Sequence, residues 1–237
     1  MRPGLAFRSE VQRQSIRDRL ARTGRAQVAD LLRPDYADHL AASAANAPFN
    51  TVTRRGDGHV DLPAAWLASL EPTQKQALGE RVQASATDGF QYLFDNHPIY
   101  DLEQTGQADA VWSELVAFLN GEAFLDLMRD LTGETRIAMA DAQLTRFRPA
   151  HFLNEHDDRA DGKNRYFAYV LGLSPRWRID WGGLLAFHGD DGNVAEAFTP
   201  RFNTLSLLKV PGPHSVTQVA LSAGAHRYSV TGWLRGR

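Results

Sequence analysis

The sequence predicts an α+β chain with a mainly helical support region, residues 1–135, and an antiparallel β core of sandwich or jelly-roll type, residues 136–237, within one integrated domain. Three observations lead to this prediction. Apolar residues in the first half recur at the spacing of amphipathic helices. From Ile137 onward, seven short β-type runs separated by turn residues follow one another within about a hundred residues. The composition, 43% hydrophobic and 23% charged residues over 237 positions, is that of a globular protein.

Helix-start and helix-end signals divide the first half into segments. Pro34 and Pro63 stand where helices begin, because the first turn of a helix does not need the missing N–H. Asn120-Gly121 and Thr132-Gly133 are typical helix ends. The predicted helices are 9–20, 34–46, 62–70, 73–86, 108–119 and 123–131, with short strands at 28–32 and 49–54.

Alternating apolar and polar residues mark the strands of the second half. Asp190-Asp-Gly-Asn193 and Ser222-Ala-Gly224 have the residue types of hairpin turns. The predicted strands are 137–147, 165–173, 183–188, 194–199, 204–210, 215–221 and 226–234.

Charge and residue usage exclude several classes of protein. The 26 Lys and Arg residues against 28 Asp and Glu leave a net charge of −2, which disfavours a nucleic-acid partner. The sequence has no apolar run of the roughly 18 residues that span a bilayer, and its N-terminus has no secretory apolar region, so we expect a cytoplasmic protein without a membrane partner. Because there is no cysteine, a metal ion would have to be held by His, Asp or Glu. No sequence feature indicates an oligomeric state.

The first candidate site is the segment Asn154-Glu-His-Asp-Asp158. On an extended segment His156 and Asp158 project from the same face and can share one cation, whereas Asp157 points the other way. Such a pair alone is more typical of an exposed polar loop than of a metal site.

A second histidine, His214, follows 58 residues later on an alternating run. Two His and one carboxylate form the facial triad that suits non-haem Fe(II) and leaves coordination positions open for a 2-oxo acid and O₂. His188, which precedes Asp190 with the same one-residue gap, is a weaker rival because it lies at a hairpin turn.

An extended dicarboxylate bound to such a metal needs a cationic partner for its far end, and Arg is best suited to this because of its planar fork of donors. Arg227 is the candidate. If the hairpin closes with Ala220 opposite Ala225, Arg227 pairs with Gln218 and shares the face of His214.

These residues resemble the Fe(II)/2-oxoglutarate-dependent dioxygenases, in particular the prolyl-hydroxylase-like branch with the ribosomal prolyl hydroxylases. The resemblance covers about 90 residues. It rests on His156-Asp-Asp158, Arg165-Tyr-Phe-Ala-Tyr-Val-Leu171, Pro175-Arg-Trp177, Trp181-Gly-Gly183, Pro213-His-Ser-Val216 and Arg227-Tyr-Ser-Val-Thr-Gly-Trp233. The first 135 residues show no such likeness.

The resemblance implies a fold, a cofactor set and residue roles. The fold is a double-stranded β-helix, a jelly-roll variant. His156, Asp158 and His214 would bind Fe(II), and Arg227 with Ser229 would bind 2-oxoglutarate. O₂ is the other co-substrate, and ascorbate is the reductant. The family commonly has a tyrosine nine residues before the first ligand; this chain has Phe147 there, and Tyr169 is the candidate substitute.

The implied activity is hydroxylation of a C–H bond, with oxidative decarboxylation of 2-oxoglutarate to succinate and CO₂. The expected substrate is a prolyl residue of a peptide or protein, or a related amino acid. Two alternatives remain open: a non-catalytic, cupin-like binding or sensor domain, and the same chemistry on a free amino acid or another small metabolite. Loops such as residues 174–181 would decide between substrates.

Overall fold

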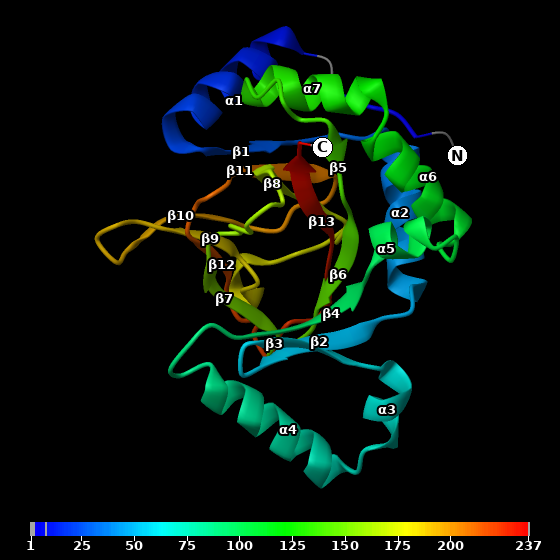
Figure 1. Ribbon diagram of the computed structural model, residues 1–237, viewed down its shortest axis with the longest axis vertical. Coiled ribbons are helices and arrows are strands. Elements are labelled where there is room, and N and C mark those ends of the chain that lie inside the picture. The colour runs from blue at the N-terminus through cyan, green and yellow to red at the C-terminus, as the bar shows by residue number, and fades with distance from the viewer. Residues whose placement is uncertain (1–2, 8, 237) are drawn as a thin grey trace.

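The computed structural model describes residues 3–7 and 9–236, and their strands form one curled antiparallel sheet. The strands are β1 (Arg25–Val28), β2 (Asn50–Arg55), β3 (Gly58–Leu62), β4 (Tyr92–His97), β5 (Met139–Ala140), β6 (Gln143–Phe147), β7 (Phe152–His156), β8 (Arg165–Gly172), β9 (Leu185–His188), β10 (Val194–Phe198), β11 (Thr204–Lys209), β12 (His214–Val216) and β13 (Arg227–Arg235). Their main path runs β1-β11-β8-β13-β6-β4-β7-β12-β9-β10 (Figure 1). The predicted α+β class with a jelly-roll core is confirmed.

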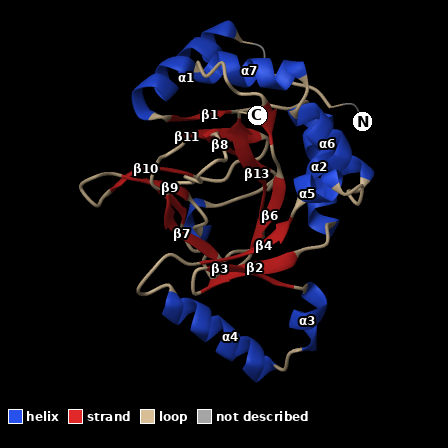
Figure 2. Ribbon diagram, in the orientation of Figure 1, coloured by secondary structure: helices blue, strands red, loops and turns tan. Residues whose placement is uncertain are grey.

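Helices lie outside this sheet, as Figure 2 shows. They are α1 (Glu10–Thr23), α2 (Pro34–Asn46), α3 (Ala64–Ser69), α4 (Pro72–Ser85), α5 (Ile99–Gln104), α6 (Ala110–Leu119) and α7 (Glu122–Thr132), with a short 3₁₀ helix, η1, at Ile179–Trp181. Ser9 caps α1 by accepting a hydrogen bond from the Gln12 amide, and Gly24 ends it with a left-handed φ of 68°. None of the described helices combines the length and apolar character needed to cross a membrane.

Four strands of the first half join the same sheet as the strands of the β core. β1 pairs with β11. β4 pairs with β7 and then β6 along one edge and with β2 along the other. The sequence did not predict β3 or β4, nor β7 in the second half. In β4 the polar run Asp95-Asn-His97 obscures the alternation, since Asp95 is buried in an ionic cluster instead of facing solvent.

Two groups of buried apolar side chains lie on the two faces of the sheet. The outer group packs the helices onto the sheet and includes Trp112, Met128 and Val230. The inner group lies inside the curled sheet and comprises Phe147, Ala168, Leu185, Phe187, Phe198, Leu208, Val216 and Val219. The inner face therefore leaves a partly filled interior in which a site can form.

The predicted hairpin between the runs at 215–221 and 226–234 is wrong. β12 ends at Val216 and pairs with β7 and β9, whereas β13 pairs with β5, β6 and β8. The connecting segment instead pairs with the loop around η1. Val219 forms an isolated β-bridge with Gly182, and the Ala220 amide donates to the Trp181 carbonyl. Arg227 therefore lies opposite Phe147, not Gln218.

A buried ionic cluster supports the turn that leads into β7. Asp95 accepts hydrogen bonds from Arg146 Nε and Arg148 Nε, both at 2.7 Å, and from the Thr51 hydroxyl at 2.7 Å. His151 closes the turn, since its amide donates to the Arg148 carbonyl. Burial lowers the pKa of the His151 imidazole to about 4, so the folded protein favours the neutral ring.

We expect His151 to make the protein acid-sensitive. Between its ordinary value of 6.5 and the folded value of about 4, the unfolded state binds one more proton. Stability is therefore unaffected above pH 6.5 and falls by roughly 3 kcal/mol as the pH drops to 4. Urea unfolding of wild type and His151→Gln across this range measures the effect. An equal pH dependence in both proteins would show that His151 is not its source.

Candidate active site

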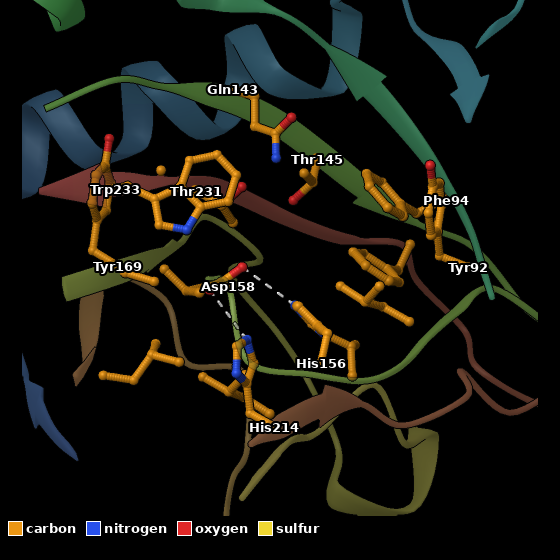
Figure 3. A pocket seen from close by; sticks show the side chains of 18 of the residues that line it. Tyr92, Phe94, Gln143, Thr145, His156, Asp158, Tyr169, His214, Thr231 and Trp233 are labelled. Atoms are coloured by element: carbon orange, nitrogen blue, oxygen red, sulfur yellow. Dashed lines mark ion pairs between the residues drawn. The ribbon is translucent and has the colours of Figure 1, made fainter. Parts of the chain in front are cut away.

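Three predicted ligands converge inside the curled sheet. His156, Asp158 and His214 each offer one ligand atom, and these atoms lie within 4.8 Å of one another. Figure 3 shows both imidazoles directed at the carboxylate. Nε2 of His156 lies 3.5 Å from Asp158 Oδ1, and Nε2 of His214 lies 3.5 Å from Oδ2.

Strand pairing places the two histidines, and a turn places the aspartate. His214, the first residue of β12, is the register partner of His156, the last residue of β7. Asp158 lies beyond the strand with a left-handed φ of 61°. The two residues of the His-x-Asp motif therefore do not share one extended strand face, and the backbone turn brings the carboxylate back toward the imidazoles.

Backbone carbonyls orient both rings for metal binding. Nδ1 of His156 lies 2.9 Å from the Asn154 carbonyl, and Nδ1 of His214 lies 2.8 Å from the Gly212 carbonyl. Since a carbonyl only accepts, each Nδ1 carries a proton, so Nε2 is the atom of each ring that can bind a metal ion once it is deprotonated.

Burial and mutual charge act on all three ligands. Burial lowers the pKa of His214, and the neighbouring His156 lowers it further. Burial opposes ionisation of Asp158, but the hydrogen bond from His156 and the nearby imidazoles outweigh it and lower the carboxyl pKa. Burial also disfavours the charged form of His156, but the hydrogen bond and charge of Asp158 raise its pKa. An ionised carboxylate with two imidazoles is a donor set that fits a divalent cation.

The three residues line a cavity of about 280 Å³ that also contains Arg227. Arg227 is 3% exposed, and its Nε and Nη1 atoms have no hydrogen-bond partner within the part of the chain that the structure describes. Burial lowers the pKa of this guanidinium to about 10. The centroid of the Phe147 ring lies 5.1 Å from the Arg227 guanidinium carbon. A buried cation without a partner is costly, so this end of the cavity fits an anionic group.

Gly183 lies beside the Arg227 side chain in a backbone conformation that favours glycine. Its φ of +61° is one that side-chain-bearing residues rarely adopt, and a Cβ there would lie 3.4 Å from Arg227 Cδ and 3.1 Å from Val219 Cγ2. Trp177, which the sequence analysis placed in a specificity loop, packs beside this glycine and donates its indole N–H to the Gly182 carbonyl at 3.0 Å. The loop therefore supports the Arg227 end of the cavity.

Comparison with known proteins identifies this arrangement. Residues 142–235, which include the metal-site residues and Arg227, match the 2OG-Fe(II) oxygenase superfamily. The match spans most of the β core, which is therefore similar in sequence to this superfamily. The chain is also 29% identical over 174 residues to a curated prolyl 3-hydroxylase, OGFOD1, from Xenopus laevis; the match covers 70% of this chain and about a third, 32%, of that relative's length.

Solved structures show the same fold along nearly the whole chain. A prolyl-4-hydroxylase from Pseudomonas putida aligns with a TM-score of 0.59 at 21% identity, covering 95% of this chain and 99% of that one. A prolyl hydroxylase from Trichoplax adhaerens, solved with a peptide fragment of hypoxia inducible factor, aligns with a TM-score of 0.58 at 15% identity, covering 97% and 94%. The oxygenase fold therefore includes the N-terminal half as well as the matched core.

Two further residues were predicted to assist 2-oxoglutarate binding in this oxygenase core. Ser229 is buried two residues after Arg227 on β13, and both residues line a second, small pocket. Tyr169 contributes to the cavity lining, but its ring packs in the helix-facing core and its hydroxyl donates to the Asp141 carbonyl at 2.7 Å. The Tyr169 proton is thus already engaged, and its role at the co-substrate stays a prediction.

Sequence reasoning missed two donors on the same strand face. Both residues line the cavity. Thr231 Oγ1 is buried without a hydrogen-bond partner among the described residues, and the Trp233 side chain acts as a donor toward Asp158, which helps to lower the pKa of that carboxyl. Arg227, Ser229, Thr231 and Trp233 occupy every second position of β13. Because alternate residues of a strand share one face, this spacing could have predicted that Thr231 and Trp233 face the same side as Arg227.

Sequence reasoning also missed an aromatic wall from the first half of the chain. Phe147 stacks on Phe94 at 5.1 Å, Phe94 contacts Tyr92 at 5.6 Å, and Tyr92 contacts Phe90 at 5.6 Å between ring centroids. Phe90 in turn lies 5.7 Å from the ring of His156. The alternation of aromatic residues at 90, 92 and 94 was a signal that the polar end of β4 obscured.

Proposed function

We propose that this chain is an Fe(II)- and 2-oxoglutarate-dependent oxygenase that hydroxylates a prolyl residue of a peptide or protein. The observation that supports it best is the placement of a His-Asp-His cluster and an unpartnered buried guanidinium around one cavity. The names of the relatives, prolyl 3-hydroxylase and prolyl-4-hydroxylase, favour proline as the substrate residue.

In this proposal His156, Asp158 and His214 hold Fe(II) through two Nε2 atoms and a carboxylate oxygen. With 2-oxoglutarate and O₂ bound, the metal supplies oxidative decarboxylation to succinate and CO₂ and the transfer of one oxygen atom to a C–H bond. The protein fixes the imidazole orientation through the Asn154 and Gly212 carbonyls before any ligand arrives.

Arg227 would hold the distal carboxylate of 2-oxoglutarate, with Ser229 beside it. A carboxylate would satisfy the donors of Arg227 that have no partner and would restore the charge balance of this end of the cavity. Phe147 supplies a ring face under the guanidinium in place of a phenol donor. We also predict that the Ser229 hydroxyl contacts this carboxylate and that Tyr169 contributes to 2-oxoglutarate binding.

The charge inventory of the cavity favours a peptide over a free amino acid. Apart from His59, which pairs with Asp61, and two tyrosines, its ionisable lining residues are the metal-site residues and Arg227, which the proposal assigns to iron and 2-oxoglutarate. A free amino acid would bring an ammonium and a carboxylate that need partners in a mostly apolar pocket, whereas a peptide-bound proline is neutral. The aromatic wall of Phe90, Tyr92 and Phe94 offers ring faces against which a prolyl ring can pack.

Several accompanying predictions belong to this proposal. They are a cytoplasmic location, ascorbate as reductant, and a peptide or protein partner without nucleic acid or membrane. The non-catalytic binding domain is the competing function. Production of succinate from 2-oxoglutarate separates the two, because a sensor domain binds the co-substrate without turnover.

We expect His214→Ala to abolish specific Fe(II) binding, because two donors cannot hold the metal facially. Anaerobic titration with Fe(II) and 2-oxoglutarate should give a weak visible charge-transfer band in wild type and none in the variant. Asp157→Ala is the matched control, since Asp157 contacts Arg159 and not the cluster, and it should retain the band. A band that persists in His214→Ala would contradict the ligand assignment.

We expect Arg227→Ala to weaken 2-oxoglutarate binding with little change in metal affinity. Loss of a charge-assisted pair in a buried site costs about 2 to 5 kcal/mol, which is roughly 30-fold or more in affinity. Arg227→Lys should recover part of it, since an ammonium lacks the planar fork. Calorimetric titration of the metal-loaded protein with 2-oxoglutarate measures both variants. Unchanged affinity in Arg227→Ala would place the distal carboxylate elsewhere.

We expect proline-containing peptides to gain one oxygen atom in the presence of Fe(II), 2-oxoglutarate and O₂, and free proline to remain unmodified. Mass spectrometry detects the added mass, and NMR of the product assigns the carbon. His156→Ala should abolish the reaction. If free proline or another metabolite reacted while peptides did not, the oxygenase chemistry would stand and the substrate proposal would be wrong.

A further inference from the structure

A chain of three polar side chains crosses the outer face of the strands that carry the metal-site histidines. Nδ1 of His188 on β9 lies 3.0 Å from Glu155 Oε2 on β7, and its Nε2 lies 2.9 Å from Ser215 Oγ on β12. None of the three lines the metal cavity. Because a carboxylate only accepts, His188 Nδ1 donates to Glu155, and Nε2 accepts the Ser215 hydroxyl proton.

These side chains neighbour the ligands in sequence. Glu155 precedes His156, and Ser215 follows His214. Because successive residues of a strand face opposite sides, the ligands point into the cavity while Glu155 and Ser215 meet outside. His188 thus connects β7 and β9 across the middle strand β12, directly behind the two imidazoles.

Strand pairing is irregular at this point. His214 pairs with His156 and Val216 with Leu153, so two steps along β12 correspond to three steps along β7. A bulge of this kind disrupts the hydrogen-bond ladder locally. β12 is also only three residues long. The backbone alone therefore holds the two histidines together weakly.

We propose that Glu155, His188 and Ser215 form a brace that sets the spacing of His156 and His214 and thereby the affinity of the metal centre. The three are positioning residues that act through the ligands. The proposal rests on the proposed function only in taking His156 and His214 as metal ligands. Since Glu155 is largely exposed, the brace should add little to global stability.

The trio has the residue types of a hydrolase triad, but its surroundings do not suit a nucleophile. Ser215 lies in the middle of a strand. The nearby amides of His188 and Thr217 already donate to the Pro213 and Leu184 carbonyls, so they cannot stabilise an oxyanion. The geometry therefore favours a connecting role.

The test is Co(II) binding, followed by calorimetry and by the visible spectrum of the bound ion, without turnover. His188→Ala and Glu155→Ala should weaken Co(II) binding by roughly tenfold and alter the spectrum, as is typical when a group supporting a ligand is lost. Ser215→Ala should also weaken Co(II) binding. Because it is the smallest change, it tests the brace even if one of the larger substitutions prevents folding.

Glu155→Gln separates the brace from a simple effect of charge. A glutamine removes the negative charge beside the metal but keeps an oxygen that accepts from His188, so it should bind Co(II) within about twofold of wild type. Asp157→Ala removes an equal charge on the other side of His156 and should also leave Co(II) binding and the spectrum unchanged.

Two results would overturn the brace alone. One is unchanged Co(II) affinity and spectrum in both His188→Ala and Ser215→Ala, even if thermal stability falls. The other is an equal loss of affinity in Glu155→Gln and Glu155→Ala, which would indicate charge and not spacing. A wild-type protein that bound no Co(II) would instead overturn the proposed metal centre together with the brace.

Discussion

The antiparallel pairing of β7 with β12 is the constraint on which the site depends. It places the last residue of one strand, His156, opposite the first residue of the other, His214, although 58 positions separate them. Backbone carbonyls two residues earlier in the chain accept from Nδ1 of each ring, and Asp158, with its left-handed backbone conformation, completes the cluster. A slip of one residue in this pairing would direct one imidazole out of the cavity.

The interior of the sheet is divided between two kinds of surface. Alternate residues of β13 present polar groups from Arg227 to Trp233, and several of their donors have no partner. The facing wall is aromatic and comes from β4, in the half of the chain outside the matched core. The ligand cluster with Arg227 and the aromatic wall thus come from different parts of the sequence.

In the absence of a ligand, part of the site lowers the stability of the folded protein. A guanidinium that is buried without a hydrogen-bond partner at Nε and Nη1 among the described residues opposes folding. The helix-facing core, with Trp112 and Met128 among its fully buried side chains, compensates for this cost. Stability is therefore concentrated on one face of the sheet, and function on the other.

The sequence by itself determined the class of fold, most strands of the β core, helix α2 to the residue, and the ligands and cationic residue proposed for the site, because periodicity and residue chemistry are local properties. It predicted the wrong connection between β12 and Arg227. The segment after β12 bonds to the loop around Trp181 and continues to another part of the sheet. No local signal in the sequence distinguishes this connection from a hairpin turn. Only the tertiary structure decided that β4 joins the sheet and that Glu155, His188 and Ser215 meet, since those contacts depend on which strands become neighbours.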